Sequence, residues 1–339
     1  MAKKGIICAG NWLVDIVKTL DRFPKEGELC NVKTIEQGGG GGPCNVLFDL
    51  AAMTDKIPLF AAGMLGKDAY GDYLMNEIIK RNINADFMCR CDVTTSFSDV
   101  MSADGKRTFF HCRGANAELA YEHLSKINVD AKIFYLGYLL LLDKLDADDP
   151  EYGTPAARLL KEFQSRNIMT VVDFVSESKE KFQRVTHASL PYIDVLAINE
   201  IEAGNTFDLE IRREDDSLDF DNMKKVLHAF MESGISNCTI LHMPECSAAI
   251  DKDHKLYIAP SFKINRSDIV GSNGAGDAFC AGVLYGIHEN MPLDEILKLG
   301  AASSFFNLKS ATASGGAVSI DKIMQQVNKG PYREVPQEF

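Results

Sequence analysis

The chain has 339 residues, which predicts about two domains or one large domain with an appendage. Its 36 Lys and Arg residues against 48 Asp and Glu residues give a formal net charge of −12. This charge argues against nonspecific nucleic-acid binding and against an anionic membrane surface as a partner. The first residues lack the pattern of a signal peptide, and no apolar run is long enough to cross a membrane. With nine scattered cysteines, we expect a cytoplasmic protein with free thiols.

Short apolar runs alternate with amphipathic segments along most of the chain. The predicted strands are Gly5–Gly10, Leu59–Met64, Ile133–Leu136, Met169–Phe174, Val195–Ile198 and Thr239–Leu241. The predicted helices are Cys44–Met53, Tyr70–Arg81, Thr154–Arg166, Ile201–Phe207, Asn222–Ser233 and Asp277–His288. This alternation predicts an α/β fold, a three-layer α/β/α core around a mainly parallel sheet.

Two segments, 14–37 and 93–113, show strand-like alternation and turn residues without a helix period. Because such segments do not fit inside a parallel sheet, we expect them to form a small β lid. Residues 1–13, 38–92 and 114–339 then form the core domain. The charged run Asp208–Asp221 predicts a solvated loop. Since a small lid leaves sheet edges exposed, we expect a homodimer that pairs through it.

Glycine marks two parts of the chain, a run of five at Gly38–Gly42 and a second group between Gly271 and Gly286. In the second group, Gly274-Ala275-Gly276 precedes a predicted helix, whose free N–H groups and dipole suit a phosphoryl group. Asp277 follows directly. It is either a residue that caps the helix or a general base that accepts the proton of an attacking hydroxyl.

Other polar residues follow predicted strands, where α/β sheets bind ligands. Asn11 and Asp15 follow the first strand, and an amide with a carboxylate suits vicinal hydroxyls. The five-glycine run before Asn45 either lets a substrate lie against bare backbone or forms a flexible loop. Glu202, one turn after Asn199, is either a helix-face acid or a ligand of hydrated Mg²⁺.

The segment GAGDAFCAG, which begins at Gly274, resembles the C-terminal signature of ribokinase-like (PfkB-type) sugar kinases. Other motifs similar to those of this family occur in the family's order over nearly the whole chain. They are Gly10–Asp15, Gly40–Val46, Gly63–Gly71, Asp104–Phe109, Gly114–Ala117 and Asn199–Glu202. The resemblance implies a ribokinase-like fold and an ATP-dependent kinase that transfers the γ-phosphoryl group of MgATP to a sugar hydroxyl.

The resemblance also implies a role for each matching residue. Asp277 is the implied general base, and the backbone of Gly274, Ala275 and Gly276 is the implied anion hole. The implied sugar-binding residues are Asn11, Asp15, Gly40, Gly41 and Asn45. The residues implied at the nucleotide are Asn199, Glu202, Ser272 and Asn273, with Glu202 as the Mg²⁺ ligand.

The chain departs from the family pattern at two places. Gly271 stands where many members have an Asp, which argues against the monovalent-cation site that some members carry. The segment His242–Ser247 lacks the glycines of the family's turn. The acceptor therefore stays open between a sugar and a nucleoside, and an acidic sugar would need Arg107 or Arg113. A non-catalytic sugar-binding or regulatory protein is the remaining alternative.

Overall fold

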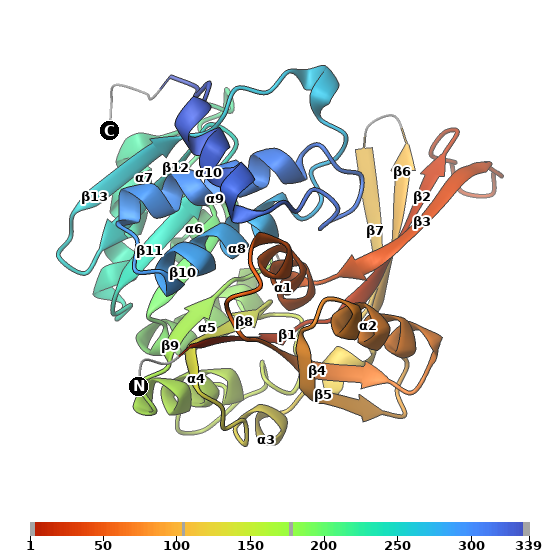
Figure 1. The fold of residues 1–339 in the computed structure, drawn as a ribbon, viewed down its shortest axis with the longest axis horizontal. Coiled ribbons are helices and arrows are strands. Elements are labelled where there is room, and N and C mark those ends of the chain that lie inside the picture. Colours follow the sequence, from red (N-terminus) through yellow and green to blue (C-terminus); the bar gives the residue numbers. More distant parts are fainter. Residues whose placement is uncertain (1–3, 104–105, 176–178, 335–339) are drawn as a thin grey trace.

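The computed structural model describes residues 4–103, 106–175 and 179–334. These residues form a nine-stranded sheet covered by helices on both faces, and a separate four-stranded sheet that projects from one side (Figure 1). Among the helices of these ranges, none combines the length and apolarity needed to span a bilayer.

Seven neighbouring strands of the large sheet run parallel, and two antiparallel strands extend one edge. In spatial order the strands are β13 (Leu256–Pro260), β12 (Cys246–Asp251), β11 (Cys238–His242), β10 (Val195–Asn199), β9 (Met169–Val172), β8 (Ala131–Gly137), β1 (Gly5–Gly10), β4 (Leu59–Gly66) and β5 (Asn84–Cys91). The chain runs outward from β1 to β5 and returns to β8 on the other side of β1. The order therefore reverses between β1 and β8, and α/β sheets bind ligands at the carboxyl ends beside such a point.

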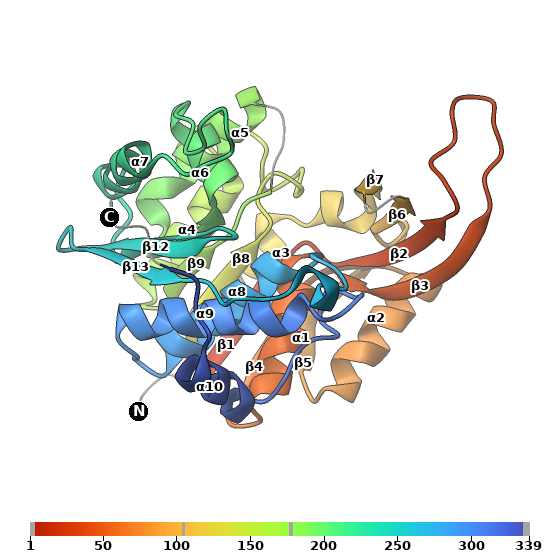
Figure 2. The ribbon, with the colours of Figure 1, turned by 90° about the horizontal axis from the view of Figure 1, so that it is seen from above.

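Each face of the sheet carries its own layer of helices (Figure 2). One layer contains α3 (Tyr121–Leu124), α4 (Pro155–Ser165), α5 (Lys179–Ser189), α6 (Glu200–Phe207) and α7 (Phe220–Glu232). The other contains α1 (Gly42–Met53), α2 (Ala69–Lys80), α8 (Ala275–His288), α9 (Leu293–Asn307) and α10 (Ile320–Lys329). Successive side chains of β8 enter opposite layers: Phe134 stacks on Phe163, and Tyr135 joins the other core. Burial on both faces explains why the strands read as continuous apolar runs.

The lid is a four-stranded sheet in the order β3 (Val32–Gly40), β2 (Leu13–Leu20), β6 (Phe97–Ala103) and β7 (Lys106–Cys112). The β2 and β6 strands pair in parallel, and the outer strands pair antiparallel to them. The β2–β3 ribbon extends well beyond the core (Figure 2). The expected turn at Asp104 and Gly105 lies outside the described residues.

The predicted fold class, strands and helices are confirmed, with shifts of a few residues at the ends. The run Gly38–Gly42 is not a flexible loop, because its first three glycines belong to β3 and its last begins α1. The strand β3 therefore extends past Gln37, where we expected the lid to end. The interpretation of 208–221 as a solvated loop was only partly right, since Ile211 and Leu218 are buried.

Candidate active site

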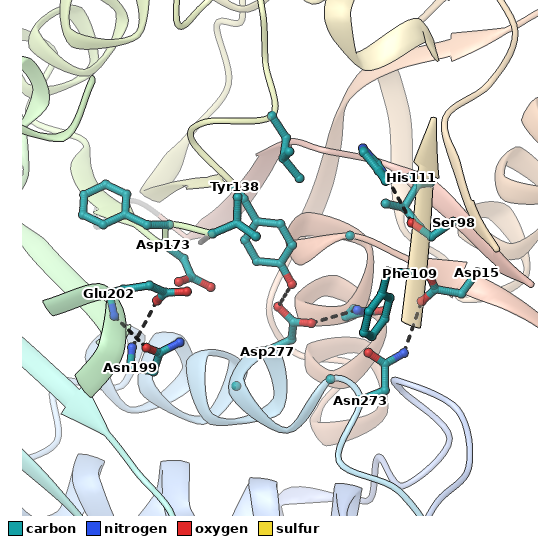
Figure 3. Close-up of a pocket in the computed structure, with 18 of the residues that line it drawn as sticks. Asp15, Ser98, Phe109, His111, Tyr138, Asp173, Asn199, Glu202, Asn273 and Asp277 are labelled. Carbon is teal, nitrogen blue, oxygen red and sulfur yellow. Dashed lines mark hydrogen bonds between the residues drawn. The ribbon is translucent and has the colours of Figure 1, made fainter. Parts of the chain in front are cut away.

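A cavity of about 490 Å³ opens at the carboxyl ends of the parallel strands, between the large sheet and the lid (Figure 3). Most of the predicted site residues line this cavity, although they come from distant parts of the chain. Those that line it are Asp15, Gly41, Asn45, Asn199, Glu202, Asn273, Gly274, Gly276 and Asp277. Those that do not are Asn11, Gly40, Ser272 and Ala275.

Asp277 is buried at the centre of the cavity, in the first turn of α8 (Figure 3). Its Oδ1 accepts a hydrogen bond from the Tyr138 hydroxyl at 2.6 Å, and its Oδ2 accepts one from Asn45 Nδ2 at 2.8 Å. The carboxylate does not cap the helix, because Gly274 is the N-cap residue. Burial raises the pKa of Asp277, while the two hydrogen bonds act in the opposite direction.

The start of α8 opens on the cavity with bare backbone. Gly274 has a φ of 76°, and a Cβ there would lie 2.2 Å from the carbonyl oxygen of Ala313. Only glycine fits this position. The N–H groups of the first helical turn have no acceptor within the helix, and Gly276 places one of them at the cavity wall. The arrangement can therefore bind an anion beside Asp277.

The lid end of the cavity carries Asp15, which lies on β2. A Cβ at Gly40 would lie 2.5 Å from Asp15 Oδ2, so this glycine makes room for the carboxylate. Asn273 Nδ2 donates to the same oxygen at 3.3 Å. Burial raises the pKa of Asp15 to about 6, although the bond from Asn273 opposes the shift.

Asn11 lies beneath the cavity wall. Gly41, with a φ of 88°, lies so close to Asn11 that a Cβ at Gly41 would be 2.0 Å from the Asn11 carbonyl oxygen. Asn11 is fully buried and does not line the cavity, so the structure does not bring this predicted sugar-binding residue into contact with the space for the acceptor.

The opposite end of the cavity is acidic. Asn199 is the N-cap of α6, and its Oδ1 accepts from the N–H of Glu202 at 2.9 Å. Glu202 Oε2 in turn accepts from the N–H of Asn199 at 3.2 Å. The three-residue spacing therefore forms a capping box, which fixes both side chains at the cavity wall. Burial raises the pKa of Glu202 from 4.5 to about 8, and burial beside Glu202 also raises the pKa of Asp173, which follows β9.

This acidic end suits a divalent cation. Four carboxylates line the cavity, and the described lining includes no Lys or Arg to balance them. Mg²⁺ binds through one or two carboxylates together with substrate phosphates and water. No cluster of three or more His, Cys, Asp or Glu residues in the described ranges forms a complete metal site. Glu202 and Asn199 therefore fit Mg²⁺ when phosphate and water complete its ligands.

We expect the metal-free protein to lose thermal stability between pH 5 and pH 8.5, by roughly 5 °C in Tm. In the unfolded chain Glu202 releases its proton near its ordinary pKa of 4.5, whereas in the fold it keeps the proton up to about 8. Rising pH therefore favours the unfolded chain through this window. Melting curves in EDTA measure the effect. Glu202→Gln should reduce it, and the raised pKa values of Asp15 and Asp173 leave a remainder of the same sign. A Tm that is flat or rises across the window in the parent protein contradicts the assignment.

Three polar residues at strand ends of the large sheet line the cavity but carry no predicted role. Tyr138 follows β8, Asp173 follows β9, and His242 ends β11. Burial lowers the pKa of His242 to about 4, so its ring is neutral, and it packs on Phe279 at 5.0 Å between ring centres. The rule that ligands gather at strand ends could have flagged all three.

Neither arginine considered for an acidic sugar lines the cavity. Arg113 donates to the carbonyl oxygen of Leu140 and to Asp143 Oδ1 at 2.9 Å. Arg107 lies against Gly271, where a Cβ would be 2.9 Å from its Nη2. The described cavity wall therefore offers no cation to an acidic acceptor.

Comparison with known proteins finds one family of kinases. The model of the pfkB family of carbohydrate kinases matches residues 3–318. The adenosine kinase of Saccharomyces cerevisiae is 24% identical over 80% of this chain and 78% of that protein. The 5-dehydro-2-deoxygluconokinase of Clostridium perfringens is 21% identical over 86% of this chain and 84% of that protein. The solved structure of Arabidopsis thaliana ribokinase with ribose and ATP superposes with a TM-score of 0.77 at 20% identity, over 96% of this chain and 99% of that one.

Proposed function

Because the chain belongs to the pfkB family of carbohydrate kinases, and is therefore a kinase of sugars or nucleosides, we propose that it transfers the γ-phosphoryl group of MgATP to a hydroxyl of a neutral sugar. The observation that carries this proposal is the position of Asp277. It lies between the lid carboxylate Asp15 and the acidic end at Glu202, beside the bare start of α8. A neutral acceptor is favoured because four carboxylates and no Lys or Arg line the described cavity.

In the proposed mechanism, Asp15 and Asn45 bind hydroxyls of the acceptor, which lies against the backbone of Gly41. Asp277 takes the proton of the acceptor's attacking hydroxyl. The oxygen of that hydroxyl bonds to the γ-phosphorus, and the bond between the γ-phosphorus and the β-phosphate oxygen breaks. The N–H groups at the start of α8, from Gly274 through Gly276, hold the transferred group. When bound at Asn199 and Glu202, Mg²⁺ neutralises phosphate charge. The lid excludes water, which would otherwise compete as the acceptor.

The relatives do not identify the acceptor, because they are named for different compounds: adenosine, a deoxygluconate derivative and ribose. A nucleoside remains the second candidate because Phe109 and Leu13 add apolar surface to the lid side of the cavity. An assay of ADP release with neutral sugars, acidic sugars and nucleosides separates these cases. We expect release with a neutral sugar. Release only with nucleosides or acidic sugars overturns the acceptor assignment, and binding without release favours the non-catalytic alternative.

We further propose a homodimer that pairs through the lid, in the cytoplasm, where the nine free cysteines stay reduced. The outer lid strands expose apolar side chains, among them Ile35 on β3 at 65% and Phe110 on β7 at 54%. Light scattering should give twice the chain mass of 37.4 kDa, and Ile35→Lys should shift the mass toward a single chain. A monomeric parent protein at micromolar concentration contradicts the proposal.

A further inference from the structure

Tyr138 makes the shortest hydrogen bond that holds Asp277, at 2.6 Å between the phenol oxygen and Oδ1. It follows β8 at the carboxyl end of the sheet and lines the cavity (Figure 3). Asn45 donates to the other oxygen of the same carboxylate, so the two donors hold the group from two sides. A carboxylate has about four acceptor positions, and two therefore remain for a ligand.

The ring of Tyr138 is fixed against α1. A Cβ at Gly42, the first residue of that helix, would lie 2.9 Å from Tyr138 Cε1 and 3.2 Å from Cδ1. The last glycine of the five-glycine run therefore leaves the space that the ring fills. This packing holds the hydroxyl at Oδ1 of Asp277.

Asp277 lies in an acidic surrounding that opposes its ionised form. Burial is the main cost of that charge, and the charge in turn raises the pKa values of four nearby carboxyl groups, those of Asp15, Asp49, Asp173 and Glu202. The titratable groups that face it are Asp15 of β2, Cys44 and Asp49 of α1, Tyr135 of β8, Tyr138, Asp173 after β9, Glu202 of α6 and Cys280 of α8. The hydrogen bonds from Tyr138 and Asn45 favour the ionised form.

We propose that Tyr138 is a positioning residue for phosphoryl transfer, whose hydroxyl fixes Oδ1 of Asp277 and keeps this carboxylate ionised and aimed at the acceptor. The inference rests on the proposed function, because it needs Asp277 as the base. The phenol keeps its own proton throughout. The proton of the acceptor hydroxyl goes to one of the free acceptor positions of Asp277, so Tyr138 acts only through that carboxylate.

The test is the pH profile of kcat for Tyr138→Phe, from pH 5 to pH 9. Phe keeps the ring on Gly42 but removes the donor, so the acid limb should move to higher pH. We expect turnover about tenfold lower on the acid side, recovering toward the parent value at high pH, with the acceptor KM changed less than about twofold. An acid limb at the parent position overturns the proposal.

Tyr135→Phe is the matched control. Tyr135 is three residues earlier, on β8, and its hydroxyl is 3.4 Å from Asp173 Oδ2 and not bonded to Asp277. The acid limb of the Tyr135→Phe profile should lie at the same pH as in the parent protein. An equal displacement of the limb in Tyr135→Phe and Tyr138→Phe overturns the proposal. If Tyr138→Phe does not fold, Gly42→Ala in the Tyr135→Phe background decides. There the added methyl group must displace the Tyr138 ring, 2.9 Å away, while the equally close Tyr135 hydroxyl is already absent, so the limb should move in the same direction. An unchanged limb in that double variant then overturns the inference.

Failure of this inference and failure of the proposed function give different results. If Asp277→Asn keeps parent turnover, Asp277 is not the base and the proposed function fails. If Asp277→Asn is inactive while Tyr138→Phe keeps the parent profile, only the role of Tyr138 fails.

Discussion

Phosphoryl transfer by the Asp277→Asn variant is expected to fall at least about 100-fold, with acceptor binding largely retained. The side chain keeps its shape but loses the basic oxygen that accepts the proton. The fold should tolerate the change, because the amide oxygen that replaces Oδ1 can still accept from Tyr138. On the other side, Asn45 can turn its amide, whose Oδ1 is buried without a partner in the described structure. Coupled ADP release measures kcat, and titration calorimetry measures acceptor binding.

Asp49→Asn is the matched control for this variant. Asp49 is equally buried, lies on α1 and feels the charge of Asp277, but it does not line the cavity. Replacing its carboxyl group by an amide should leave turnover within a few-fold of the parent. Turnover of Asp277→Asn within the same few-fold range rules out Asp277 as the base.

The parallel core could be predicted because its strands are buried on both faces and read as apolar runs. Two elements that the sequence did not reveal, β5 and α9, lack this signal. β5 lies at the sheet edge, is only half-buried and contains Asn84, Asp86 and Arg90. α9 follows Pro292 without a side-chain cap and is apolar on most sides, so neither a capping signal nor a clear amphipathic period marks it.

The polar residues of the candidate site were predictable where short motifs place them on one strand end or one helix start. Asn199 and Glu202 are an example, since their spacing also forms the capping box that holds them. The position of Tyr138 after β8 could have flagged it, but its contact with Asp277 was not predictable, because the contact joins residues 139 positions apart. The only trace of that contact in the sequence is Gly42, whose missing side chain leaves room for the ring.

The capping box makes Glu202→Gln a test of charge without loss of the helix start. Gln keeps an oxygen that accepts the N–H of Asn199, so α6 should begin as before. Gln lacks the negative charge of the carboxylate that we propose as the Mg²⁺ ligand. We expect kcat/KM for ATP to fall about 100-fold and the half-saturating Mg²⁺ concentration to rise. Initial rates over a matrix of ATP and Mg²⁺ concentrations measure both.

Glu200→Gln separates this effect from a general loss of acidic charge on α6. Glu200 is as buried as Glu202, at 6% exposure, but its Oε1 accepts from Arg212 Nε at 2.8 Å, away from the cavity. Breaking that pair should lower Tm because Arg212 loses a buried acidic partner and keeps only the more exposed Glu245 and Asp216, while the Mg²⁺ dependence stays at the parent value. If Glu202→Gln also keeps the parent Mg²⁺ dependence, the acidic end of the cavity does not hold the metal. The raised pKa of Glu202 is then a property of its burial alone.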